Sequence, residues 1–286
     1  MKRIRLLTLA VGSLLVVLAP SGARAGLVIP PNQTFNGLTQ AELANRWWQW
    51  ALSYPAPVNP LLDATGAFSY LGDQGPVFFL AGTIGNATFS RTVTVRSDQA
   101  IFVPVFPFIT WDGISAYHPG TYANLLRDVE ETAGIGPTGS APNTTLLLTL
   151  NGSSLPLPPG TTSLLDFRQT SPALFNLTVP ANNAFGLTGP DYPGTFPSVS
   201  DGWWVLLNPL PVGQYTLRFR GDTTGIGAYA GGTIFTDTTY TITSVPEPAA
   251  WLLCGVGTVV VMAARPHRPE KRPAPCGGLT RSDLDS

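Results

Sequence analysis

A histidine and an acid in the segment WDGISAYHPG come closest to catalytic machinery in this sequence. His118 is the only histidine between residues 26 and 244, and Asp112 lies six positions before it. A Ser-His-Asp hydrolase would have to use His118, but the chain contains no G-x-S-x-G elbow. A single histidine also gives a metal ion no second imidazole. The pattern therefore favours a loop role for His118 over catalysis.

Carboxylates are the second source of possible chemistry, because glycosidases use two acids placed across a cleft. Residues 26–244 contain thirteen acids, and none lies in a specific motif. The cluster Asp128-Val-Glu130-Glu131 is interpreted as the solvated end of a helix. A polysaccharide-acting enzyme or carbohydrate-binding module would use acids and exposed tryptophans. The candidate positions for that alternative are Asp112, Asp201, Trp111, Trp203 and Trp204.

Composition argues against several other function classes. The two cysteines, Cys254 and Cys276, both lie outside residues 26–244, so this part can form neither a disulfide nor a thiolate zinc site. The chain has no calcium-binding loop, P-loop or G-x-G-x-x-G motif, and we expect no cofactor and no metal. Residues 26–244 hold seven arginines, no lysine and thirteen acids, a net charge of −6. We therefore expect no nucleic-acid partner.

Two helices are predicted to position these residues. Thr39 and Glu42 form a capping box that predicts a helix ending near Ser53, before Pro55 and Pro57. Its apolar stripe contains Leu43, Trp47, Trp50 and Tyr54. The motif RWWQW is interpreted as a core anchor rather than a sugar-stacking platform. A second helix is predicted over 122–132, with Gly134 as the left-handed residue past its end.

The rest of this part alternates short strands with turn residues. Strands are predicted over 77–83, 91–96, 100–106, 146–150, 174–179, 203–207, 214–220 and 233–243. The segments 134–144, 151–163 and 186–202 are rich in Gly, Pro, Ser, Thr and Asn, and loops are predicted there. The pattern indicates a mainly all-β fold, an antiparallel β-sandwich or jelly-roll-like domain with one or two short helices.

The N-terminus has the three parts of a secretory signal peptide. Lys2, Arg3 and Arg5 precede an apolar stretch over 6–19, and Ala23-Arg24-Ala25 forms a small-residue cleavage pattern before Gly26. We expect export through the Sec translocon, with signal peptidase removing residues 1–25. The β-rich domain would then span 26–244.

The C-terminus combines Val245-Pro246-Glu247-Pro248 with an uncharged run over 249–264 and a basic cluster that begins at Arg265. This combination resembles the PEP-CTERM sorting signal of Gram-negative bacteria. The resemblance implies processing by an exosortase near the Pro-Glu-Pro, with 245–268 as the signal and transmembrane helix. A helix of sixteen residues spans roughly 24 Å, less than the ~30 Å hydrocarbon core. Here 269–286 forms a Pro-rich tail, expected to be disordered and cytoplasmic, whereas the family usually stops soon after its arginines.

The exported part is also similar to a group of uncharacterised bacterial exported proteins. The segments that carry this similarity are RWWQWALSYPAPVNPLLDATG, GPVFFLAGTIG, RTVTVRSDQAIFVPVF and SDGWWVLLNPLPVGQYTLRFRG. Members of the group carry two cysteines where this chain has Ser69 and Thr92 or Val93, and a histidine where it has Tyr215. The resemblance therefore implies that the group's disulfide, and any role of that histidine, are missing here.

These observations predict an exported protein without catalytic activity. It would be held briefly at the inner membrane, sorted by an exosortase, and released to the cell surface, outer membrane or extracellular matrix. Its role there would be structural or interactive, with extracellular polysaccharide as a candidate partner. The alternative is an exported polysaccharide-acting enzyme or carbohydrate-binding module.

Overall fold

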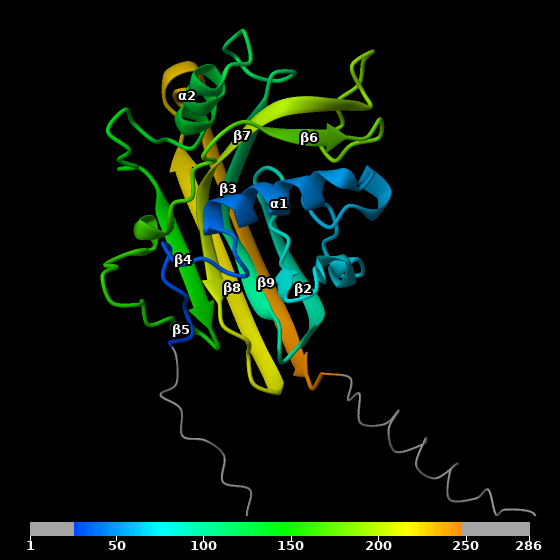
Figure 1. Cartoon of the computed structure of the whole chain (residues 1–286), viewed down its shortest axis with the longest axis vertical. Coiled ribbons are helices and arrows are strands. Elements are labelled where there is room, and N and C mark those ends of the chain that lie inside the picture. Colours follow the sequence, from blue (N-terminus) through cyan, green and yellow to red (C-terminus); the bar gives the residue numbers. More distant parts are fainter. Residues whose placement is uncertain (1–25, 248–286) are drawn as a thin grey trace, which may run out of the picture. The chain divides into compact units, whose positions relative to one another are not determined.

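The computed structural model describes residues 26–247, and this part of the chain is mainly β. Figure 1 shows two sheets with helix α1 lying across one of them and helix α2 at the end remote from the two chain ends. The helices are α1 (Gln40–Ser53) and α2 (Tyr122–Thr132). The strands are β1 (Val77–Phe79), β2 (Ala87–Arg96), β3 (Ala100–Trp111), β4 (Thr145–Leu150), β5 (Ser153–Ser154), β6 (Phe175–Val179), β7 (Gly194–Leu207), β8 (Gly213–Thr224) and β9 (Thr233–Val245).

The two sheets are mixed, so the prediction of purely antiparallel pairing is wrong. One sheet has the order β1-β3-β7-β6 and the other β2-β9-β8-β4-β5. β1 runs parallel to β3, and the last strand, β9, lies between β2 and β8 and runs parallel to β2. The alternation of apolar and polar residues fixes which face a strand buries and carries no information about the direction of its neighbour.

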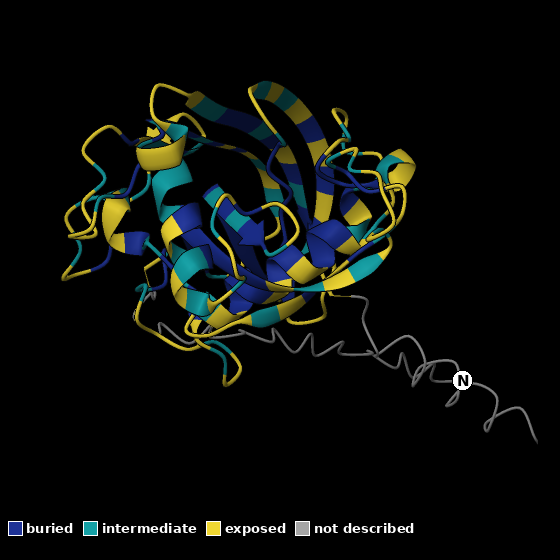
Figure 2. Ribbon diagram, turned by 90° about the horizontal axis from the view of Figure 1, so that it is seen from above, coloured by how far each residue is buried: buried dark blue, intermediate teal, exposed yellow. Residues whose placement is uncertain are grey.

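The four-stranded sheet is buried on both faces. On β7, Trp203, Val205 and Leu207 belong to a core shared with the five-stranded sheet. Trp204 and Leu206 on the same strand belong to a second core, formed with α1. Figure 2 shows the resulting continuous burial of the central strands. This double cover explains the unbroken apolar runs of β3 and β7, because neither face of these strands meets water.

The five-stranded sheet has one buried face and one face in water. On β8, Leu217 and Phe219 are buried, whereas Thr216 and Arg218 are exposed. The alternating strands predicted from sequence belong to this sheet. Its outer face is rich in hydroxyl groups, because Ser90, Thr92 and Thr94 of β2 pair in register with Thr239, Thr241 and Thr243 of β9.

Both predicted helices are confirmed. The Thr39 side chain accepts a hydrogen bond from the Glu42 amide, and Glu42 accepts one from the Thr39 amide, so the predicted capping box is present. The interpretation of RWWQW as a core anchor is also confirmed, because Trp47, Trp48 and Trp50 are all buried. The predicted left-handed Gly134 follows α2 with φ +70°.

The predicted loop over 186–202 is wrong in its second half. β7 begins at Gly194 and pairs with β6 through Thr195, Phe196 and Pro197. Its first residues contain Gly and Pro, which are typical of turns, but this end of the strand carries little buried apolar surface and tolerates them. The short strand β5 likewise lies inside the predicted loop 151–163.

The first and last described segments meet the same turn, between β7 and β8. Val28 bridges Leu207, and the Asn208 side chain donates a hydrogen bond to the Gly26 carbonyl at 2.7 Å. The Ser244 hydroxyl donates to the Leu210 carbonyl at 2.8 Å. Figure 1 shows both ends leaving at the same end of the sheets. The predicted signal peptide, with Ala23 and Ala25, and the predicted helix and tail, with Pro248 and Arg265, lie outside the described residues.

Within residues 26–247, no helix is both long and apolar enough to cross a membrane.

The position of Trp47 predicts a large loss of stability on truncation. Its ring is fully buried against the four-stranded sheet, and its Nε1 donates to the Leu80 carbonyl at 2.7 Å. We expect Trp47→Ala to lower the free energy of unfolding by about 3–5 kcal/mol, measured by urea denaturation. The neighbouring Arg46→Met, on the exposed side of the helix, should change it by less than about 0.5 kcal/mol. Equal effects would show that α1 does not stabilise the sheet it covers.

Candidate functional site

The tryptophans proposed for a sugar-binding surface are not at the surface. Trp111, Trp203 and Trp204 are each no more than 1% exposed, so the prediction that they are exposed is wrong. Trp203 and Trp204 point to opposite faces of β7 and fill different cores. Trp111 packs with Phe185 and Phe196, and its Nε1 donates to the Tyr192 hydroxyl at 3.3 Å. Their role is packing.

Asp201, the second candidate acid, is fully buried and held by an arginine. Arg168 donates to its two carboxylate oxygens at 2.9 and 2.6 Å, and the Gly202 amide donates at 2.6 Å. Arg168 also donates to Glu130 of α2 at 2.6 Å. Burial lowers the pKa of Arg168, but the two acids outweigh this and raise it. A carboxylate engaged in this way is a structural link between β7 and α2.

The acids of α2 are not the solvated helix end predicted from sequence. Asp128 is 2% exposed and accepts hydrogen bonds from Thr110, the Ala116 amide and Tyr229. Burial and Asp128 raise the pKa of Tyr229 to about 12. Glu131 accepts from Tyr117, the Ala228 amide and Arg127. These acids pin two loops, around 115–117 and 228–229, onto the helix, and the sequence could not show it because their partners are distant.

Asp112 and His118 do meet, but on the surface and without a nucleophile. Their side chains lie 3.3 Å apart and are 45% and 63% exposed. The nearby Ser115 hydroxyl donates to the Tyr117 carbonyl at 3.1 Å. Asp112, Asp201 and Trp111 thus do not form a common site. Within the described residues, no three His, Cys, Asp or Glu side chains are grouped so as to hold a metal ion.

The positions that hold cysteine and histidine in the similar exported proteins have ordinary contacts here. Ser69, Thr92 and Val93 line one shallow cavity beside the edge of β2. The hydroxyl of Tyr215 donates to the Pro211 carbonyl at 2.9 Å, in the turn that precedes β8.

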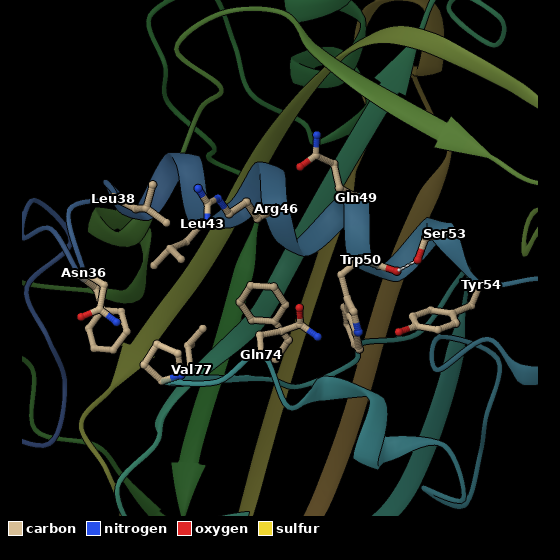
Figure 3. Close-up of a pocket in the computed structure, with 13 residues that line it drawn as sticks. Asn36, Leu38, Leu43, Arg46, Gln49, Trp50, Ser53, Tyr54, Gln74 and Val77 are labelled. Atoms are coloured by element: carbon tan, nitrogen blue, oxygen red, sulfur yellow. Dashed lines mark hydrogen bonds between the residues drawn. The ribbon is translucent and has the colours of Figure 1, made fainter.

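The best-formed cavity runs between α1 and β1, and we call it the α1 groove (Figure 3). Its volume is about 620 Å³. The floor consists of side chains of the second core that α1 and the sheet leave partly uncovered, namely Leu43, Trp50, Val77 and Phe79. The rim carries polar and aromatic side chains, namely Phe35, Asn36, Arg46, Ser53, Tyr54 and Gln74. A concave apolar floor with a few polar groups around it is typical of a ligand site.

A tight hairpin closes one end of the α1 groove. Phe35 and Leu38 exchange two backbone hydrogen bonds, at 2.8 and 3.0 Å. Asn36 and Gly37 between them have φ +50° and +78°, the positive values that a two-residue type I′ turn requires. Asn-Gly is the strongest short sequence signal for such a turn, so this element was detectable from the sequence and our sequence analysis missed it.

The polar groups of the groove rim have few partners in the protein. Arg46 makes no ion pair or hydrogen bond with any described residue, unlike the six other arginines of residues 26–247. The side chains of Asn36 and Tyr54 also lack a hydrogen bond to any described residue. Gln49 lines the groove, but Figure 3 shows it turned away, and its amide donates to the Asn176 carbonyl at 2.9 Å. Asp and Glu are absent from the lining.

No family model, curated protein or solved structure matches this chain.

The Arg168–Asp201 pair predicts a strongly asymmetric response to mutation. Arg168→Met leaves the fully buried Asp201 carboxylate without its cation, which should cost about 3–5 kcal/mol of unfolding free energy. The double variant Arg168→Met/Asp201→Leu removes both charges and should be more stable than Arg168→Met alone. Urea denaturation of the two variants tests this. A double variant at least as unstable as the single one would contradict the role of the pair.

The hydrogen bonds to Glu131 predict loss of stability in acid. Burial acts to raise the pKa of Glu131, but donation from Tyr117, Ala228 and Arg127 outweighs it, so this pKa lies below its usual value. The carboxylate thus stabilises the fold above the unfolded-state pKa of about 4.3, and this contribution disappears as the pH falls through the folded pKa.

We expect Glu131→Gln to flatten the fall in unfolding free energy measured between roughly pH 5 and pH 3. The exposed Asp191 accepts no hydrogen bond on its side chain from described residues, so Asp191→Asn serves as the control. An unchanged pH dependence in Glu131→Gln would show that the Glu131 carboxylate does not stabilise the fold.

Proposed function

We propose that this chain is an exported, non-catalytic interaction domain that an exosortase sorts to the cell surface or extracellular matrix. The observation that carries the proposal is the junction between β9 and the Pro-Glu-Pro. Val245 is the last residue of β9 and accepts a hydrogen bond from the Ser97 amide at 2.7 Å. Pro246 and Glu247 follow at once and are exposed.

This junction suits cleavage near the Pro-Glu-Pro. β9 is a central strand of its sheet, yet its pairing ends at Val245. Cutting the chain beyond Glu247 would remove no strand pairing of residues 26–245. The Gly26–Val28 segment meets the same turn as Ser244, so removal of a signal peptide would also occur at this end. Both proposed processing steps thus act at the end of the domain that is remote from α2.

The non-catalytic role is supported by the surroundings of the acids. Asp201 is bound to Arg168, Asp128 is surrounded by donors, and Asp112 contacts only an exposed histidine. The α1 groove has no acid in its lining. The groove therefore offers contacts to a ligand but neither an acid nor a histidine that could act as general acid or base.

The sorting proposal predicts a defined mass for the exported protein. In a Gram-negative host with an active exosortase, we expect mass spectrometry to find a chain that begins at Gly26 and ends near the Pro-Glu-Pro. Substituting Pro246, Glu247 and Pro248 together by alanine should leave the C-terminal segment attached. The control Asp191→Ala should be processed normally. Recovery of exported wild-type protein with its tail intact would overturn the proposal.

A further inference from the structure

The shape of the α1 groove restricts the kind of molecule that fits it. Its floor of Leu43, Trp50, Val77 and Phe79 is apolar, and one side of the groove is open to water. A simple alkyl chain lying there would keep apolar surface in water on its outer side, at about 25 cal/mol per Å². A sugar ring matches the cross-section better. It can place its C–H face on an apolar or aromatic floor and direct its hydroxyl groups toward the rim and the solvent.

The polar side chains of the rim suit a ligand with many hydroxyl groups. Asn36 and Tyr54 lie at opposite ends of the groove in Figure 3, with the Gln74 carboxamide between them. The Gln74 side chain donates to the Leu71 and Asp73 carbonyls at 3.1 and 3.2 Å, which leaves its Oε1 as an acceptor. Carboxamide and phenol groups both donate and accept, as a hydroxyl ligand requires.

The charge of the groove selects for an anion. Arg46 lies on its upper rim without a partner among the described residues. The nearest acid on the helix is Glu42, one turn earlier, and it accepts hydrogen bonds from Thr39 at 2.8 and 2.9 Å. Asp73 is bound to Arg96 at 2.7 Å. Arg46 is thus an uncompensated cation on a domain of net charge −6. A planar guanidinium binds a carboxylate through two parallel hydrogen bonds.

We infer that the α1 groove binds an acidic oligosaccharide, a chain that contains uronate sugars. Arg46 binds the carboxylate of one uronate unit. Asn36, Tyr54 and Gln74 bind hydroxyl groups, and the sugar rings lie over Trp50 and Phe79. The inference rests on the proposed non-catalytic interaction role and specifies the ligand class for that role.

The test uses an oligogalacturonate as the probe and the full-length chain in a mild detergent. We expect isothermal titration calorimetry to detect binding by the wild type. Arg46→Met should weaken it about tenfold or more, the effect of losing one charge-assisted contact. Raising the salt concentration from about 0.05 to about 0.5 M should weaken binding by the wild type and have little effect on Arg46→Met. Tyr54→Phe, which removes one hydroxyl group, should weaken binding severalfold.

The matched control is Arg220→Met, which removes an arginine from β8, outside the groove lining, and should bind like the wild type. Failure of the wild type to bind, or equal binding by Arg46→Met, would overturn the inference. Equal affinity for a neutral malto-oligosaccharide would overturn the role of the carboxylate. A chain that is processed in the host yet fails to bind refutes only the ligand, because the mass measurement tests sorting independently of binding.

Discussion

The two-sided burial of the four-stranded sheet is the constraint on which the rest of the structure depends. All seven residues from Ala100 to Phe106 are buried, so β3 has no face that can meet water. Such a sheet is stable only with a cover on each side. The five-stranded sheet supplies one cover through Leu217, Phe219 and Tyr240. The other is α1 with its three tryptophans. The capping box at Thr39 matters because it fixes where this covering helix begins.

Close packing of the covers brings a cation into the interior, and the backbone satisfies it. Arg91 points inward from β2 and is 2% exposed. No carboxylate contacts it within the described residues. Its guanidinium donates to the carbonyls of Asp63, Ala81 and Gly82 at 2.6, 2.5 and 2.9 Å. A buried charge is tolerated when hydrogen bonds replace those it made to water. Arg91 therefore holds the irregular segments on both sides of β1 against β2, and so stabilises the strand that floors the α1 groove.

Features set by residues close in the sequence could be predicted, and features set by distant partners could not. The bounds of both helices follow from caps and stripes within a few residues, and the structure has them as predicted. The eight predicted strands all correspond to observed strands, but the insertion of β9 beside β2 joins residues about 150 positions apart. The burial of Asp128 and Asp201 depends on Tyr229 and Arg168, 101 and 33 residues away. The α1 groove was missed for the same reason, since its walls come from three separate segments.

The arrangement separates the ligand site from the proposed point of processing. The lining of the α1 groove comes entirely from residues 35–79, whereas the Pro-Glu-Pro follows β9 of the other sheet. Between them lies the four-stranded sheet, whose two cores pack on opposite faces. A cut beyond Glu247 removes no contact of Trp50 or Phe79. The groove therefore has the same walls before and after the proposed cleavage, and the domain requires no rearrangement on release to bind its ligand.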